Sequence, residues 1–393
     1  MKRILTLCLV LVFSLGLLAG CAQTTQLRSY SEDALNADPG QLAYGAYAPD
    51  TVVMTINGTD VRWDEFAFWL CTKAEELAEA DGTRTVNDWD AVYDEETGET
   101  YAQALLRMVL EELKQFHAIQ AKAASFDMEL GEDGEAYVEQ SLDETMQTLG
   151  ADSEQTRADR MRRAYLDTDV LRYQAEISYY YLLLYQELFG ADGEKLSADE
   201  LNDYVAQNGY MTVKHILLGT VDANGNPLPD DEKERKFKQA TRIIDRLNAI
   251  EDPTERLAAF DRYAAEYNED PGVASYPNGY CFLPGQMTEA FETASAALEP
   301  YAVTPEPVES EYGYHVILRL PTTGTDVLDY NTDGSPYLLQ SDAAQMLYTQ
   351  MVHAWIDDAE VVWKPEFENL DVQALFTEEE TFLEKLDFLH WFH

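Results

Sequence analysis

Apolar residues repeat at intervals of three and four over residues 63–77, which predicts a helix with one buried face. The residues on that face are Trp63, Phe66, Leu70, Ala74 and Leu77. Residues 101–116 carry nearly the same pattern, and residues 159–189 carry many tyrosines among leucines. Ser197 and Glu200 form the capping-box pattern that begins a further helix, and Gly209 ends it. The region up to residue 209 is therefore predicted to be mostly helical.

Shorter β-rich runs lie before and after this region. Asn57-Gly58 separates two of them, and this dipeptide supplies the positive φ angles of a two-residue turn, so residues 52–61 are predicted to form a small hairpin. Beyond residue 210 we expect strands and helices to mix. The predicted strands are Thr212–Leu218 and Gly313–Leu320, and the predicted helices are Glu232–Ala249 and Thr254–Tyr267. Residues 210–321 therefore have the size and mixture of an α+β domain.

The first twenty residues have the pattern of a secretory leader. Met1-Lys2-Arg3 is positively charged, and residues 4–18 form an apolar run too short to span a bilayer comfortably. The run ends in Leu18-Ala19-Gly20-Cys21, which resembles the bacterial lipobox, where the cysteine thiol receives a diacylglycerol before cleavage. We therefore predict a lipoprotein signal peptide over residues 1–20 and lipidation of Cys21. The alternative is a short transmembrane anchor with an incidental cysteine.

Composition divides the rest of the chain. Residues 21–50 are polar, with few large apolar side chains, which is typical of a tether. Residues 51–209 form the helical region, and residues 322–393 follow the α+β domain with a polar linker, an amphipathic helix over Ser341–Asp358 and a last helix capped at Thr377. We expect this C-terminal segment to pack on the helical region, because an isolated amphipathic tail is unstable in water.

The chain is strongly acidic. Its 393 residues include 73 Asp and Glu against 27 Lys and Arg, which gives a net charge of −46. The hydrophobic content of 46% is that of a folded protein, and the length allows two or three domains. An acidic surface repels phosphate backbones, which excludes nucleic acid as a partner. The same charge disfavours an anionic membrane surface, so membrane attachment depends on the lipid at Cys21.

The common catalytic signatures are missing. The sequence contains no GxxxxGK loop, no HExxH pair and no GxSxG elbow, which removes most kinase and hydrolase interpretations. It contains no CxxC pair, so neither a zinc site nor a thioredoxin-like redox site is predicted, and no cofactor is expected. Cys71 and Cys281 lie far apart in the sequence and are interpreted as packing residues.

Five segments of residues 210–321 occur in a distinctive order and spacing. They are Val213-Lys214-His215-Ile216-Leu217-Leu218, Asn268-Glu269-Asp270-Pro271-Gly272, Gly285-Gln286-Met287 with Phe291, Pro307-Val308, and Tyr312-Gly313-Tyr314-His315-Val316-Ile317. In this order and spacing the domain resembles the parvulin family of peptidyl-prolyl cis-trans isomerases. The resemblance implies an α+β domain with a small antiparallel sheet flanked by helices, inserted in a helical chaperone lobe. It also implies rotation about X-Pro bonds without any cofactor or metal.

Matching by motif assigns the family's functional groups to this chain. The two strand histidines and the neighbouring acidic residue correspond to His215, His315 and Asp270. The apolar slot for the prolyl ring corresponds to Phe282, Met287 and Phe291. Each assignment has a structural alternative: the histidines as hydrogen-bonded core residues, Asp270 as the start of a turn at Pro271-Gly272, and the slot residues as ordinary core.

The chain also departs from the family pattern. Where many members have a Gly-Gly-Asp-Leu-Gly run, this chain has Tyr276-Pro277-Asn278-Gly279-Tyr280-Cys281, so one wall of the slot is not predicted. The remaining histidines match no motif and are interpreted as surface or packing residues: His117, His353, His390 and His393.

The flanking regions resemble the lipid-anchored extracytoplasmic foldases of Gram-positive bacteria, on the strength of the Cys21 motif, residues 53–66 and residues 197–218. This implies an isomerase and chaperone for unfolded or partly folded exported polypeptides, held at the cell membrane by its lipid. The resemblance is compatible with a monomer or a homodimer. The alternative is a holdase or structural lipoprotein with an inactive parvulin domain. A solute-binding lipoprotein is disfavoured by the long helical stretch of residues 101–189.

Overall fold

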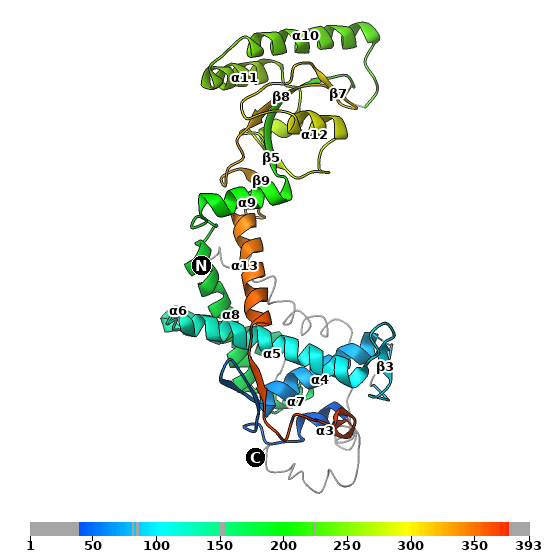
Figure 1. Ribbon diagram of the computed structural model, residues 1–393, viewed down its shortest axis with the longest axis vertical. Coiled ribbons are helices and arrows are strands. Elements are labelled where there is room, and N and C mark those ends of the chain that lie inside the picture. Colours follow the sequence, from blue (N-terminus) through cyan, green and yellow to red (C-terminus); the bar gives the residue numbers. More distant parts are fainter. Residues whose placement is uncertain (1–38, 81, 84–85, 149–153, 223–224, 377–393) are drawn as a thin grey trace. The chain divides into compact units, whose positions relative to one another are not determined.

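The computed structural model describes residues 39–376, except 81, 84–85, 149–153 and 223–224 (Figure 1). The chain divides into two compact units, Met1–Glu187 with Thr349–His393, and Leu188–Tyr348. Helices and small antiparallel sheets together confirm the predicted α+β class. The predicted signal peptide, Cys21, most of the tether, the helix predicted from Thr377, His390 and His393 lie outside the described residues.

The first unit is helical with a small sheet. Its strands are β1 (Val52–Ile56), β2 (Thr59–Arg62), β3 (Val92–Asp94), β4 (Glu99–Thr100) and β11 (Val361–Trp363). Its helices are α3 (Pro39–Tyr44), α4 (Trp63–Ala80), α5 (Tyr101–Ser125), α6 (Gly131–Thr148), α7 (Glu154–Arg163), α14 (Val372–Leu375) and most of α8 (Thr168–Phe189). The predicted hairpin is confirmed, with φ of 52° at Asn57 and 81° at Gly58. Strand β11 pairs antiparallel with β1, so residues from both ends of the chain form one sheet.

Aromatic side chains fill the core of this unit. The predicted apolar face of α4 is confirmed, since its five residues are at most 7% exposed. Phe367, from the C-terminal segment, packs on Trp63 and Tyr47 at ring-centroid distances of 6.1 and 5.0 Å. The stretch of residues 159–189 is mostly helical, as predicted, and is divided between α7 and α8, because Tyr165 has a φ of 56° and Asp167 accepts a hydrogen bond from the Val170 amide to begin α8.

The second unit contains a four-stranded antiparallel sheet in the order β6-β5-β8-β7. Its strands are β5 (Met211–Gly219), β6 (Tyr280–Phe282), β7 (Val308–Ser310) and β8 (Gly313–Leu320). Its helices are α9 (Ala198–Asn208), α10 (Asp230–Asn248), α11 (Pro253–Tyr267), the short 3-10 helix η2 (Pro271–Ala274) and α12 (Glu289–Ala296). Helices α10 and α11 pack on one face of the sheet, and α12 packs on the other (Figure 1). The candidate residues His215 and His315 lie on the α12 face.

The segment interpreted as a polar linker is partly folded into the second unit. Residues 327–338 form a hairpin of β9 (Val327–Tyr330) and β10 (Pro336–Leu338), and α13 (Leu339–Asp357) follows directly. Asp326 accepts hydrogen bonds from the Thr212 hydroxyl at 2.5 Å and the Thr323 amide at 2.9 Å. These contacts attach the segment to β5. The polar composition of the segment does not indicate this attachment.

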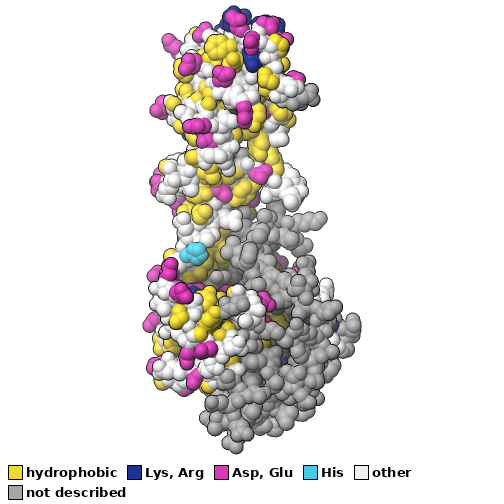
Figure 2. All heavy atoms as spheres, turned by 90° about the vertical axis from the view of Figure 1, so that its right-hand side faces the viewer, with side chains coloured by type: hydrophobic (Ala, Val, Ile, Leu, Met, Phe, Trp, Pro, Cys, Tyr) yellow, Lys and Arg dark blue, Asp and Glu magenta, His cyan; other side chains and the backbone are white. Residues whose placement is uncertain are grey.

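On the face shown in Figure 2, acidic side chains are spread over the described residues of both units. On the same face Lys and Arg gather at the end of the second unit that α10 forms, and the basic residues of α10 are Lys233, Arg235, Lys236, Lys238, Arg242 and Arg246. Several of these cations already have carboxylate partners within hydrogen-bond distance, such as Lys236 with Glu269 and Lys238 with Glu234. This patch therefore does little to offset the acidic character of the surface.

Candidate active site

Strand alternation and register bring the two predicted histidines together. His215 follows Met211 and Val213 at intervals of two on the α12 face of β5, and His315 precedes Ile317 on the same face of β8. His215 is paired with Ile317 and Leu217 with His315, so the histidines are diagonal neighbours across the ladder. Their rings stack at 5.3 Å with an interplanar angle of 19°, and their Nδ1 atoms are 3.1 Å apart.

Asp270 lies beside His215 because of a local turn. Its Oδ1 accepts a hydrogen bond from the Gly272 amide at 3.0 Å and caps η2, while its Oδ2 lies 3.0 Å from His215 Nε2. The turn interpretation and the site interpretation therefore describe the same side chain. Burial alone would raise the pKa of Asp270, but hydrogen bonds from His215, Tyr280 and the Gly272 amide hold it well below its usual range.

Asn268 fixes the approach of this turn to the sheet. Its Oδ1 accepts hydrogen bonds from the Leu217 amide at 2.8 Å and the Asp270 amide at 3.1 Å. Its Nδ2 donates to the His215 carbonyl oxygen at 3.2 Å. One amide side chain thus ties the turn that carries Asp270 to strand β5 at His215 and Leu217. Asn268 stands in one of the five segments that resemble the parvulin family, but the sequence alone does not indicate its role.

Two further hydroxyl groups complete the polar site. The Ser310 hydroxyl, at the end of β7, lies 2.7 Å from His315 Nε2. The Tyr280 hydroxyl, at the start of β6, donates to Asp270 Oδ2 at 2.5 Å. Sequence reasoning did not identify either residue, because Ser310 lies in a short edge strand and Tyr280 lies in the run that departs from the family pattern.

When both rings are neutral, these contacts are satisfied by one order of protons. Ionised Asp270 accepts, so His215 carries its proton on Nε2 and offers Nδ1 as an acceptor. His315 then donates from Nδ1 to His215, and its Nε2 accepts from Ser310. Burial, then the neighbouring His215, lower the pKa of His315 to about 4, so this ring is neutral at neutral pH. The polar site is a hydrogen-bond chain of two imidazoles, of which the His315 ring is neutral, and one carboxylate.

The predicted apolar residues lie against this chain at different depths. Phe291, in α12, presents its edge to both histidine rings, with centroids 5.3 Å from His215 and 5.2 Å from His315. Phe282 is only 1% exposed and lies behind Phe291, at 6.0 Å between centroids. Met287 is partly buried against the same cluster, and its amide donates to Glu292 at 2.8 Å. Phe291 therefore borders the polar site, Met287 packs in the same apolar cluster, and Phe282 supports them from the core.

The cysteines of the described residues are structural. Cys71 and Cys281 are both buried, as their interpretation as packing residues requires. Cys281 lies in strand β6, where it pairs with Thr212 of β5 in the ladder. Burial raises the pKa of the Cys281 thiol to about 12, so it is protonated and unreactive at neutral pH.

The family comparison agrees with this geometry. Residues 215–320 match the family model described as Rotamase, PPIC-type PPIASE domain. Fold and site therefore define this part of the second unit as a parvulin-type peptidyl-prolyl isomerase domain. The match begins at His215 and includes Asp270, Ser310 and His315.

Beyond this domain the chain is similar to foldases named PrsA. The foldase protein PrsA of Halalkalibacterium halodurans is 26% identical over 230 residues, which is 58% of this chain and 60% of that protein. The foldase protein PrsA of Geobacillus kaustophilus is 32% identical over 125 residues, which is 31% of this chain and 36% of that protein. The chain spans three fifths or less of the length of these curated relatives.

Solved structures of this group align only loosely. PrsA from Bacillus subtilis covers 86% of this chain with 94% of its own, at 19% identity and a TM-score of 0.20. PrsA from Bacillus anthracis covers 71% of this chain at 16% identity and a TM-score of 0.22. Such TM-scores are too low to support a common arrangement of the whole chain.

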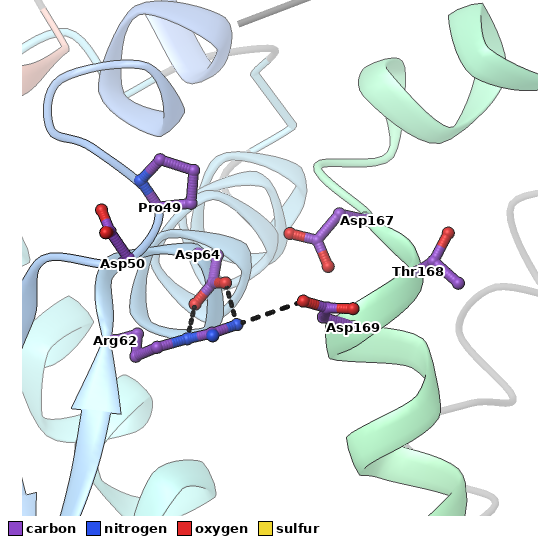
Figure 3. Close-up of a pocket in the computed structure, with 7 residues that line it drawn as sticks. All are labelled: Pro49, Asp50, Arg62, Asp64, Asp167, Thr168 and Asp169. Atoms are coloured by element: carbon purple, nitrogen blue, oxygen red, sulfur yellow. Dashed lines mark hydrogen bonds and ion pairs between the residues drawn. The ribbon is translucent and has the colours of Figure 1, made fainter.

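A separate cavity of about 410 Å³ lies in the helical unit (Figure 3). It is lined by Pro49, Asp50, Arg62, Asp64, Asp167, Thr168 and Asp169. Arg62 contacts both carboxylate oxygens of Asp64 at 2.5 and 3.3 Å, and lies 3.7 Å from Asp169. Asp167 caps α8. The ion pairs of Arg62 with Asp64 and Asp169 stabilise this unit, as does the cap that Asp167 provides for α8. None of the residues that line the cavity belongs to the isomerase site.

Among the described residues, no group of three or more His, Cys, Asp or Glu side chains is arranged to hold a metal ion. Among the same residues, no helix combines the length and the apolar character needed to cross a bilayer.

Proposed function

We propose that this protein is a peptidyl-prolyl cis-trans isomerase and foldase that assists exported polypeptides at the outer face of the cytoplasmic membrane. The observation that carries the proposal is the chain of hydrogen bonds from Asp270 through His215 and His315 to Ser310, bordered by the Phe291 ring. A family model for this activity matches the same residues.

The chemistry of the site suits rotation about an amide bond. This rotation must overcome a barrier of about 18–20 kcal/mol set by amide resonance, and no bond to the enzyme is required. The polar groups at the site are two imidazoles, of which His315 is kept neutral by burial, and a carboxylate of low pKa, none of which is an activated nucleophile. An apolar wall at Phe291 and Met287 strips water from a prolyl ring, while fixed donors and acceptors favour the twisted amide.

The proposed location and partners rest on the sequence and on the relatives. The lipobox at Cys21 supports attachment through a lipid, and the curated relatives are named as foldases. Unfolded or partly folded exported chains are the proposed clients. Wild-type protein grown with labelled palmitate should incorporate the label and the Cys21→Ala variant should not, and a C21A protein labelled like the wild type would contradict the lipid anchor.

A refolding experiment separates a foldase from a pure holdase. A client whose refolding is limited by proline isomerisation shows a phase of tens to hundreds of seconds. Substoichiometric mature protein should shorten this slow phase by at least about tenfold, which is about 1.4 kcal/mol off the barrier. Suppressed aggregation with an unchanged slow phase would instead support the holdase alternative, in which the isomerase domain is inactive.

A further inference from the structure

Tyr280 occupies a position next to the reacting centre that the family pattern does not predict. It begins strand β6 opposite Val213, so it shares the α12 face of the sheet and lies diagonal to His215. Its ring meets the His215 ring edge-on, with centroids 5.4 Å apart and an interplanar angle of 72°. Its hydroxyl donates to Asp270 Oδ2 at 2.5 Å. One side chain thus contacts two members of the polar chain.

The Asp270 carboxylate is held from three directions. Oδ2 accepts from both His215 Nε2 and the Tyr280 hydroxyl, and Oδ1 accepts from the Gly272 amide. The Gly272 bond alone leaves Oδ2 able to move with the His215 ring. Because Tyr280 comes from another strand, its bond stops this movement and so fixes the direction in which Asp270 receives the His215 proton.

Two glycines make room for this tyrosine. A Cβ atom at Gly272 would lie 2.3 Å from the Tyr280 hydroxyl oxygen. Only glycine at this position therefore lets the turn approach the phenol so closely. Gly279 has a φ of 112°, and a Cβ atom there would lie 2.6 Å from the Val213 carbonyl oxygen. The backbone at Gly279 therefore lets β6 begin against β5 with Tyr280 directed at Asp270.

We propose that Tyr280 is a positioning residue of the isomerase site, whose hydroxyl and ring together hold Asp270 and His215 in the geometry that orders the hydrogen-bond chain. The inference rests on the proposed isomerase function and extends it by one residue. Tyr280 acts through Asp270 and His215 and forms no bond to the peptide. Its contribution therefore depends on the charge of Asp270, which allows a test that ordinary packing would fail.

The central variant is Tyr280→Phe in the full mature chain, since it keeps the ring and removes the donor. We expect kcat/KM for exchange in an Ala-Pro peptide to fall about tenfold, as for the loss of a hydrogen bond to a charged group. We expect the carboxyl ¹³C titration of Asp270, followed by NMR, to move to higher pH by about one unit, because one donor that stabilises the charged form is gone. Tyr276→Phe is the matched control: it removes the hydroxyl of a neighbouring ring, 5.1 Å away between centroids, and should change neither quantity.

A double-mutant cycle with Asp270→Asn separates positioning from packing. In the D270N background the carboxylate is absent, so adding Tyr280→Phe should slow exchange by less than about twofold. Equal losses in both backgrounds would overturn the proposal in favour of a packing role, as would a Y280F protein with wild-type exchange and an unmoved Asp270 titration. The proposed function can fail separately: wild-type protein that does not accelerate exchange overturns both, whereas an active wild type with an unaffected Y280F overturns this inference alone.

Discussion

Burial and neighbouring groups set the protonation states of His315 and Asp270. Burial opposes a charge on His315, whose pKa falls to about 4, whereas three hydrogen bonds keep the Asp270 carboxylate ionised. The proton on His215 Nε2 is then directed at Asp270. A neutral His315 and an ionised Asp270 give the site fixed hydrogen-bonding groups, which suits a reaction that needs no proton exchange with solvent.

The low pKa of His315 makes the second unit sensitive to acid. Its pKa falls from 6.5 to about 4 on folding, so between these values the unfolded chain binds a proton that the folded chain does not. Stability therefore decreases as pH falls from about 6.5 to 4, by about 3 kcal/mol, and does not change with this group above pH 6.5. The His315 ring signals in NMR should titrate with a midpoint near 4. A midpoint near 6.5 would show that the ring is not held neutral by burial.

Ser310 is expected to matter through His315 Nε2. Replacing Ser310 by Ala removes the hydroxyl 2.7 Å from this buried acceptor, which is then left without a partner. We expect a loss of about 1–3 kcal/mol in stability of the second unit and about tenfold slower X-Pro exchange. Ser341→Ala is the control, because its hydroxyl donates to the Asp192 carbonyl far from the site in sequence. Exchange at the wild-type rate in S310A would place Ser310 outside the functional chain.

At the level of residues, the sequence predicts the matched motifs and misses their partners. His215, Asp270 and His315 stand in segments whose spacing marks them, so their proximity was predictable. Ser310 and Tyr280 reach the same chain only through strand register, which a single sequence does not specify for strands of three residues. The slot residues were predictable as a group, but the deep burial of Phe282 depends on α12 covering the sheet.

Among the elements, long periodic helices and the Asn-Gly hairpin were predictable, whereas short strands were not. β11 has three residues and no turn signal, yet it pairs with β1 and returns the chain to the helical unit. The break at Tyr165 was also missed, because apolar periodicity continues on both sides of it. Pairing with a distant strand and a single residue with positive φ are both tertiary effects that override local pattern.

The C-terminal segment should stabilise the helical unit through Phe367. This side chain is 2% exposed and packs on Trp63 and Tyr47, so Phe367→Ala should destabilise that unit by about 3–5 kcal/mol. Val362→Ala is the control in the same segment, since Val362 is 54% exposed, and should cost less than about 1 kcal/mol. Thermal unfolding followed by tryptophan fluorescence reports the change. Equal, small effects of both variants would mean that this segment does not support the unit.

For the whole molecule, charge sets the expected substrate preference. The chain carries a net charge of −46, and the loop from Gly219 to Asp231 contains Asp222, Asp230 and Asp231 but no Lys or Arg. Two lysines on neighbouring elements already contact carboxylates, Lys236 with Glu269 at 2.5 Å and Lys214 with Asp261 at 2.6 Å. A dianionic phosphate needs unpaired cationic donors to offset its desolvation. We therefore expect the site to disfavour acidic peptides.

Four peptides in one exchange assay test this preference. Lys-Pro and Ala-Pro should be isomerised faster than Glu-Pro and phosphoserine-Pro, and the difference should shrink as salt is raised, because screening acts beyond about 8 Å at physiological ionic strength. A phosphopeptide isomerised faster than its unmodified form would contradict the charge argument while leaving the isomerase activity in place.

The central claim is that the chain of Asp270, His215 and His315 catalyses rotation about X-Pro bonds. The most direct measurement is NMR exchange between cis and trans forms of an Ala-Pro peptide, with wild-type mature protein and with His215→Phe, which keeps a ring against Phe291 but has no ring nitrogens. We predict that substoichiometric wild type accelerates exchange well beyond the spontaneous time of tens to hundreds of seconds, and that H215F loses at least about tenfold while its sheet stays folded. Exchange no faster than in buffer at stoichiometric wild type, or equal exchange with folded H215F, would contradict the account.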